Sequence, residues 1–145
     1  MRWWLAALVV FGLSQAASAQ SRRTFVPTSD AIRMAEIIAR AQGYDLDDRR
    51  RYFFDLVRDR EGKPLIAGFT TFEFQWNGSL VSTIAIDDHS GLAVDTTSCT
   101  IYAYPALRPF QSAVARSAPD ALRDKTGCDR FRVADTPRTH RQPRR

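Results

Sequence analysis

The sequence predicts an α+β fold, in which one N-terminal helix packs on an antiparallel four-stranded meander, followed by a short C-terminal helical segment. Three observations predict it. Residues 30–42 have the apolar spacing of an amphipathic helix, the segments after them alternate like strands, and tight turns separate those segments. One helix can cover the apolar face of such a sheet. The chain of 145 residues is of a length typical for one domain.

The helix at residues 30–42 is predicted from its ends and its spacing. Residues 28–30 (Thr-Ser-Asp) favour a helix N-terminus, and Gly43 stands where a helix commonly ends. Between them, apolar residues recur at helical spacing along one side: Ile32, Ala35, Ile38 and Ala39. This side is expected to face the sheet.

Four strands are expected after a polar connector: residues 52–59, residues 65–76, the run from Leu80 to Ile86, and residues 92–101. Turn-forming sequences separate them, and Asn77-Gly78 is a strong signal for a hairpin. The second strand alternates so that one face carries its largest apolar side chains: Phe72, Phe74 and Trp76. These aromatic side chains are expected to form the core beneath the helix.

Two cysteines, Cys99 and Cys128, are expected to form a disulfide. A metal-binding or redox pair is the alternative, but the sequence has neither a C-x-x-C motif nor a histidine near them. A short helix is expected at residues 120–126, just before Gly127, and another near residues 110–118. The disulfide would then tie this C-terminal helical segment to the last strand.

Residues 1–19 are expected to be a cleaved signal peptide. Arg2 supplies positive charge, residues 3–13 form an uncharged and mostly apolar run, and residues 17–19 (Ala-Ser-Ala) match the A-x-A form of a cleavage site. The run has 11 residues, whereas a membrane-spanning helix needs about 20. A retained membrane anchor is the alternative. The sequence therefore predicts export, to the periplasm or beyond the cell, and a folded domain over residues 20–128.

The excess positive charge is concentrated in residues 129–145, which hold six arginines and two aspartates. This Arg/Pro-rich tail is expected to be disordered, because it has too few apolar residues to offset the entropy lost on ordering. A mobile, solubilising terminus is one interpretation, and attachment to an anionic membrane surface is the other. The arginines proposed for such attachment are Arg138, Arg141, Arg144 and Arg145. The tail does not favour nucleic acid as a partner, because no aromatic side chain follows Phe131.

The order of motifs resembles that of the PepSY domain, a small exported bacterial module. The likeness covers about residues 29–97 and rests on Gly43-Tyr44, Trp76-Asn77-Gly78, and the hairpin that runs from Ile84-Ala85-Ile86-Asp87 to Ser90-Gly91-Leu92-Ala93. The resemblance implies a cystatin-like α+β unit that restrains a peptidase or binds an envelope protein. It supplies no catalytic residue, and the segment with Cys128 has no counterpart in that module.

Catalytic, metal and cofactor sites find little support in the sequence. His89 beside Asp87 and Asp88 is the one clustered imidazole–carboxylate set, but it offers fewer ligands than zinc or calcium sites use. No nucleophile motif and no glycine-rich phosphate loop is present in the sequence. We therefore expect a non-catalytic protein without a cofactor.

Aromatic residues exceed what one thin sheet face can cover, so some are candidates for an exposed binding surface. Those candidates are Tyr52, Phe54, Tyr102 and Tyr104. Burial beneath the C-terminal segment is the alternative for them.

Three functions remain open from the sequence. The leading hypothesis is an exported, non-catalytic binding module with a protein partner. The second is an adaptor that attaches to lipid or lipopolysaccharide through its basic tail. The third is a small hydrolase or metal-binding protein, in which His89 would act.

Overall fold

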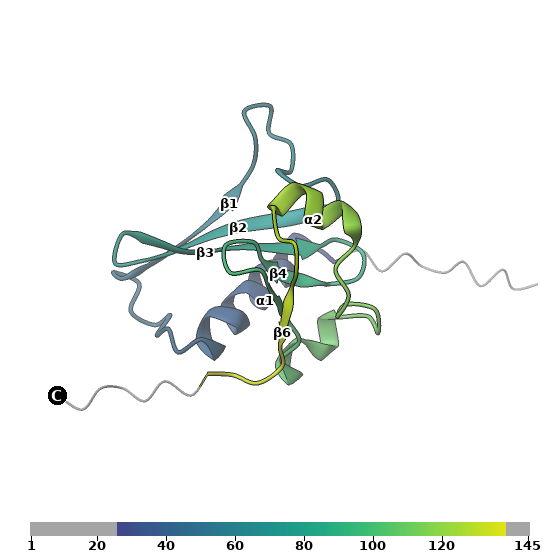
Figure 1. Cartoon of the computed structure of the whole chain (residues 1–145). Coiled ribbons are helices and arrows are strands. Elements are labelled where there is room, and N and C mark those ends of the chain that lie inside the picture. Colours follow the sequence, from purple (N-terminus) through teal and green to yellow (C-terminus); the bar gives the residue numbers. More distant parts are fainter. Residues whose placement is uncertain (1–25, 139–145) are drawn as a thin grey trace, which may run out of the picture.

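A computed structural model of the chain describes residues 26–138. Its elements, in chain order, are α1 (Thr28–Ala41), β1 (Tyr52–Val57), β2 (Phe69–Trp76), β3 (Ser79–Asp87), β4 (Ala93–Asp95), β5 (Thr100–Tyr102), the 3₁₀ helix η1 (Pro105–Phe110), α2 (Asp120–Thr126) and β6 (Arg132–Ala134) (Figure 1). The expected signal peptide at residues 1–19 lies outside the described residues. Within the described residues, no helix has the length and apolar character needed to cross a bilayer.

The strands form one six-stranded mixed sheet in the order β1-β2-β3-β4-β5-β6. Neighbouring strands from β1 to β5 are antiparallel, and β6 lies parallel to β5. The predicted α+β class is therefore confirmed, and Asn77-Gly78 does join β2 to β3. The predicted four-stranded sheet is wrong in two places, both on the side of the sheet that follows β3.

The first correction concerns residues 92–101, which were expected to form one strand. The chain instead turns back between β4 and β5. The Asp95 carboxylate causes this turn by accepting hydrogen bonds from the backbone N–H groups of Thr97 and Ser98. Cys99 completes the turn with a φ of 50°. The turn contains neither glycine nor proline, the residues that mark turns most strongly in a sequence.

The second correction concerns the tail. Disorder was expected from residue 129 onward, but residues 132–134 form β6 and pair with β5. The Arg132 N–H donates to the Cys99 carbonyl, and the Ala103 N–H donates to the Ala134 carbonyl. These are backbone bonds, so the polar composition of the segment does not prevent them. Residues 139–145, which include Arg141, Arg144 and Arg145, lie outside the described residues.

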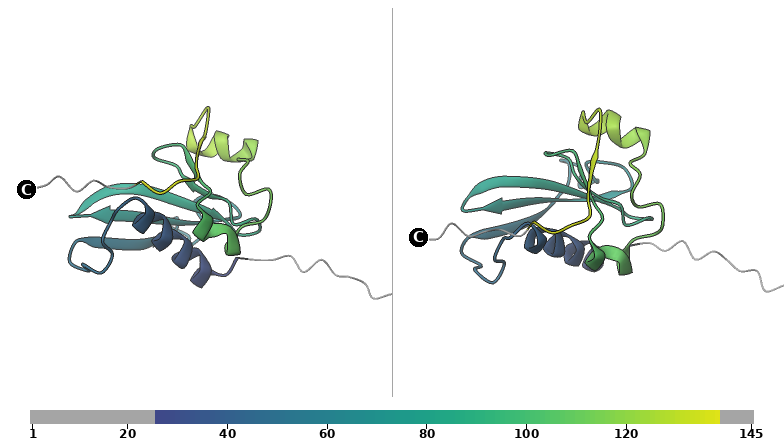
Figure 2. Two further views of the ribbon diagram at one scale, coloured as in Figure 1. Left: turned by 90° about the horizontal axis from the view of Figure 1, so that it is seen from below. Right: turned by 60° about the horizontal axis from the view of Figure 1, so that its bottom comes forward.

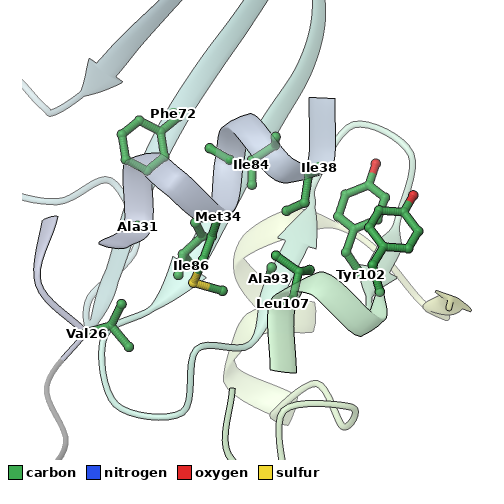
Figure 3. Packing of buried hydrophobic residues seen from close by; sticks show 12 residues of the cluster. Val26, Ala31, Met34, Ile38, Phe72, Ile84, Ile86, Ala93, Tyr102 and Leu107 are labelled. Atoms are coloured by element: carbon green, nitrogen blue, oxygen red, sulfur yellow. The ribbon is translucent and has the colours of Figure 1, made fainter. Parts of the chain in front are cut away.

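The first face of the sheet is covered by α1 and η1. Met34 and Ile38 of α1 point toward apolar side chains of the sheet and toward Leu107 of η1 (Figure 3). The helix starts at Thr28, two residues before the predicted start, and it ends as predicted near Gly43. There the Tyr44 N–H donates to the Ala39 carbonyl, which is the closing bond of a Schellman motif. This motif turns the chain from α1 toward β1.

Within residues 26–138, the second face is covered at one end only. Leu122 of α2 and Ala115 pack there with apolar residues of β2 to β5, such as Val94 and Ile101. Figure 2 shows α1 and η1 on one side of the sheet and α2 on the other. The predicted helix at residues 120–126 is confirmed, whereas the one expected near residues 110–118 is wrong, because η1 ends at Phe110 and turns follow it. The predicted disulfide is also present: Cys99 and Cys128 have a Cα–Cα distance of 5.7 Å, and they tie the end of α2 to the start of β5.

Candidate functional site

A polar pocket of about 400 Å³ lies on the α1 face of the sheet, at the C-terminal end of α1. Its floor consists of short or hydroxyl-bearing side chains from β3, β4 and β5: Ser82, Asp95, Thr100 and Tyr102. Its rim comes from the end of α1, from β6 and from the segment after β6, and includes Gln42, Tyr44, Arg132, Thr136 and Arg138. The pocket thus exists because the end of the chain returns across the sheet.

Strand pairing places the floor residues side by side. Asp95 pairs with Ile84 on one side and with Thr100 on the other, so these three share a face of the sheet. Thr100 in turn pairs with Arg132 of β6. Ser82 precedes Ile84 by two residues on the same strand and points to the same face. The register therefore gathers polar groups from four neighbouring strands.

Asp95 is the centre of the floor and is only 3% exposed. One carboxylate oxygen accepts the two turn N–H groups described above, and the other accepts the hydroxyl of Tyr102 at 3.2 Å. The Tyr102 hydroxyl also receives a hydrogen bond from the side-chain amide of Gln42. A chain of bonds therefore runs from α1 through Tyr102 to Asp95.

The two tyrosines that line the pocket, Tyr102 and Tyr104, both have raised pKa values. Burial raises the pKa of Tyr102 above its usual value, and the neighbouring Asp95 carboxylate raises it further. Burial also raises the pKa of Tyr104, while the Arg138 guanidinium acts in the opposite direction. In Figure 3 the Tyr102 side chain extends away from Ala93 and Leu107, and Tyr102 lines the polar pocket. Tyr102 thus serves as a stable hydrogen-bond donor to Asp95.

Ser82 is the exception on the floor. Its side chain is 1% exposed, and within the described part of the chain its hydroxyl has no hydrogen-bond partner. Buried hydroxyl groups are nearly always bonded, because an unsatisfied one costs about 1 to 3 kcal/mol. Thr71, on the opposite face of the sheet, has the second such hydroxyl among residues 26–138. Ser82 differs from Thr71 in lining a pocket of about 400 Å³.

Two arginines stand at the rim. The Arg132 Nε donates to the Thr100 hydroxyl at 2.9 Å, which holds its side chain against the pocket. The backbone N–H of Arg138 donates to the Ala41 carbonyl at the end of α1. This bond holds the chain after β6 beside the end of α1, at the rim of the pocket. Both arginine side chains remain exposed. Arg138 was predicted to attach to an anionic surface, and this remains a prediction.

A second candidate is the uncovered part of the other sheet face. Phe53 of β1 pairs with Gln75 of β2, which pairs with Leu80 of β3, so all three point to one face. Phe54 packs under α1, which places Phe53 on the side away from the helix. Phe53 is 56% exposed and Leu80 is 54% exposed. Figure 1 shows α2 and β6 at the other end of the sheet. We call Phe53, Gln75 and Leu80 the open face.

Of the four aromatic residues predicted to form a binding surface, the structure buries two and leaves two half-buried. Tyr102 and Tyr104 are 3% and 2% exposed, so their predicted surface exposure is wrong and the alternative of burial holds for them. They are covered because α1, η1 and Ala134 of β6 pack against them. Tyr52 and Phe54 are half-buried, and Phe54 stacks on Phe74 with ring centroids 4.9 Å apart. A partner-binding role for Tyr52 and Phe54 remains a prediction.

The acidic segment around His89 forms a turn. The Asp87 carboxylate accepts the backbone N–H groups of His89 and Ser90, and the Asp88 carboxylate accepts the Thr70 hydroxyl. Both carboxylates are therefore used to shape the turn between β3 and β4. In the part of the chain that the structure describes, no three metal-ligating side chains gather into one group.

The polar pocket was missed from the sequence although a signal for it was present. Ser82 stands among Leu80, Ile84 and Ile86 in the predicted third strand, at a position that the alternation assigns to the buried face. Asp95 directly follows the apolar residues 92–94 in the predicted fourth strand. Polar residues at buried positions are the informative exceptions to hydrophobic patterning.

The chain was compared with known proteins. No family model matches it, and no curated protein matches it. A solved structure, that of a type VI secretion system effector-immunity complex from Pseudomonas protegens, contains a chain of similar fold. The TM-score is 0.61 and the sequence identity is 20%, over 77% of this chain and 96% of that chain. At this identity, the likeness shows a shared fold.

Proposed function

We propose that the protein is an exported, non-catalytic binding module that recognises a protein partner through its open face and the free edge of β1. The observation that carries this proposal is the exposure of Phe53 and Leu80 on one uncovered face of the sheet, beside an edge strand. Phe53 and Leu80 flank Gln75 on this face, and exposed apolar side chains around a polar one offer contacts to a protein partner. An edge strand adds unpaired backbone groups, to which an extended segment of a partner can bond.

Two further observations support this class of function. The similar fold occurs in a chain of an effector-immunity complex, which is an assembly of proteins. The Cys99–Cys128 disulfide is compatible with an oxidising compartment, as the proposed export requires. Within this class, the PepSY resemblance favours restraint of a peptidase or binding of an envelope protein as the specific role.

The test is a crosslinking capture from an envelope extract of the source organism. The bait is the exported chain, and the variant is the double substitution Phe53→Ser and Leu80→Ser. Because both side chains are more than half exposed, the variant should fold normally while losing its apolar contacts. The matched control is Val114→Ser, which removes an apolar side chain that is 69% exposed and lies outside the open face.

A protein captured by the wild type and by the control, but lost with the double variant, would support the proposal. Equal capture by all three baits would place the binding surface elsewhere. If the double variant unfolds, as judged by its thermal transition, the single substitution Phe53→Ser gives the same comparison with a smaller perturbation.

A further inference from the structure

The polar pocket contains a buried carboxylate that has no ion pair. Asp95 is 3% exposed, and no lysine, arginine or histidine among residues 26–138 forms a salt bridge with it. Aspartate is rarely buried to this extent unless it is paired, because removing a charge from water is costly. The three donors around Asp95 are two backbone N–H groups and one hydroxyl, all of them uncharged.

The carboxylate has capacity left on the side of the pocket. Each carboxylate oxygen can accept about two hydrogen bonds. Oδ1 of Asp95 already accepts two, from Thr97 and Ser98, whereas Oδ2 accepts one, from Tyr102. One acceptor position on Oδ2 is therefore unused in the described part of the chain.

Ser82 provides a second unused acceptor on the same floor. It lies on β3 two residues from Ile84, the direct neighbour of Asp95 on β4, so the two side chains are diagonal neighbours on one face. Such neighbours have Cα atoms about 7 to 8 Å apart. Its hydroxyl is buried and unbonded, and both residues line the same pocket of about 400 Å³. A group with several N–H donors could bond to both.

We propose that the polar pocket binds one cationic group, a guanidinium or an ammonium, which donates hydrogen bonds to Oδ2 of Asp95 and to Oγ of Ser82. Tyr102 acts as a positioning residue, because its hydroxyl holds the Asp95 carboxylate while Gln42 holds the hydroxyl. Hydrogen bonds between an ionised donor and a carboxylate are about twice as strong as neutral ones. The cation would supply the opposite charge that Asp95 lacks.

The arginines at the rim oppose this cation and limit its affinity. Arg132 and Arg138 are exposed, so solvent and salt screen their repulsion over a Debye length of about 8 Å. Asp95 is buried, and its attraction for a bound cation is screened much less. The attraction of a cation by Asp95 therefore outweighs its repulsion by Arg132 and Arg138. Removal of a rim charge should strengthen binding of a cation, and it would weaken binding of an anion.

The experiment is a titration followed by NMR chemical shifts, on the full chain purified with its disulfide formed. The probes are acetyl-Gly-Arg-Gly-amide and acetyl-Gly-Lys-Gly-amide, with acetyl-Gly-Gln-Gly-amide and acetyl-Gly-Glu-Gly-amide as uncharged and anionic controls. Methylguanidinium and butylammonium form a second arm, which separates a free small cation from a side chain that a polypeptide presents. We expect saturable shifts of the Asp95 and Ser82 amides with at least one cationic probe and with neither control.

The variants test the two floor residues and the rim. Asp95→Asn should weaken binding at least about tenfold, because the charge is lost. Ser82→Ala should weaken it about three- to tenfold while leaving the unfolding temperature unchanged or higher, because its hydroxyl makes no bond in the protein. Arg138→Gln should strengthen binding about twofold, by removing an exposed like charge. Asp124→Asn on α2 removes an exposed carboxylate outside the pocket and should change nothing.

Three results would overturn the proposal. The first is the absence of saturable shifts with every cationic probe. The second is binding that Ser82→Ala leaves unchanged. The third is binding that Arg138→Gln weakens, since that sign indicates an anionic ligand. Should Asp95→Asn fail to fold, Ser82→Ala and Arg138→Gln still decide the question. None of these variants alters the open face, so this test and the capture experiment can fail independently.

Discussion

The sheet face beneath the C-terminal end of α1 has two different halves, one toward β1 and one toward β6. Toward β1 it carries an aromatic cluster, which includes Tyr44, Tyr52, Phe54, Phe74 and Trp76. The Phe74 ring contacts two others: the Tyr44 ring lies edge-on to it, and the Phe54 ring stacks on it. In each pair the ring centroids are 4.9 Å apart. Toward β6 the same face carries the polar pocket. Tyr44 contributes to both regions and forms the boundary between them.

The difference follows from which side chains the strands supply. On the side of β1 and β2, large rings fill the space between helix and sheet, with Phe74 fully buried. On the side of β3 to β5, the corresponding positions hold Ser82, Asp95 and Thr100, whose short side chains leave space above the sheet. One region is thus specified by close packing, and the other by directional hydrogen bonds. The two should respond differently to substitution.

The largest effect is expected in the aromatic cluster. Phe74→Ala removes a fully buried ring that contacts Tyr44 and Phe54, and it should lower the free energy of unfolding by about 3 to 5 kcal/mol. Urea unfolding followed by tryptophan fluorescence measures this, since Trp76 belongs to the same cluster. A loss below about 1 kcal/mol would contradict the close packing of this region.

The disulfide should stabilise mainly the part of the sheet formed by β5 and β6. Cys99 and Cys128 are 29 residues apart, and cross-links of this span stabilise by about 3 to 4 kcal/mol on the chain-entropy model. The double substitution Cys99→Ala and Cys128→Ala should lower stability by up to this amount. Hydrogen exchange should increase more at the Arg132 amide, which bonds to the Cys99 carbonyl, than at Phe72 in β2. Equal increases at both amides would show that the disulfide does not hold β6 locally.

A smaller effect is expected from Tyr102→Phe in the pocket. The substitution keeps the ring but removes the hydroxyl that donates to Asp95, so it should lower the free energy of unfolding by about 1 to 3 kcal/mol. Chemical unfolding at neutral pH measures this. The Phe74→Ala variant should lose more, and the reverse order would mean that hydrogen bonding outweighs packing here.

The pH dependence offers a further readout of the same substitution. Burial raises the pKa of Tyr102 in the folded state, so above the ordinary tyrosine pKa of about 10 the unfolded chain binds fewer protons than the folded one. The wild type should therefore lose stability as the pH rises past about 10. In Tyr102→Phe this loss should be smaller but not absent, because the pKa of Tyr104 is also raised.

Local sequence patterns predicted the elements that depend on local interactions. The helix ending at Gly43, the hairpin at Asn77-Gly78 and the helix before Gly127 each rest on a few neighbouring residues. The disulfide between Cys99 and Cys128 was predicted because the expected export would place both cysteines in an oxidising compartment and no metal or redox motif surrounds them. Alternation also placed Phe72 and Phe74 correctly beneath the helix.

The candidate sites depended on contacts that local patterns do not contain. Phe53 lies in a predicted strand and Tyr102 directly follows one, yet Tyr102 is buried and Phe53 is exposed. What separates them is which later segment covers each face: η1 and β6 cover Tyr102, whereas α2 packs at the other end of the sheet from Phe53. Composition and spacing do not show where those segments return.

The sequence by itself therefore determined the α+β class, the helix and the strands up to β3, because hydrophobic spacing and turn residues act over a few positions. It also determined the cysteine pair, which the expected oxidising compartment favours. The tertiary structure alone decided the pairing of β6 with β5 and the pocket that lies beneath the end of α1 and the chain after β6. Residues 132–134 gain their hydrogen bonds from a strand about 30 positions earlier in the chain. Only folding brings that strand edge, the buried carboxylate of Asp95 and the returning chain together.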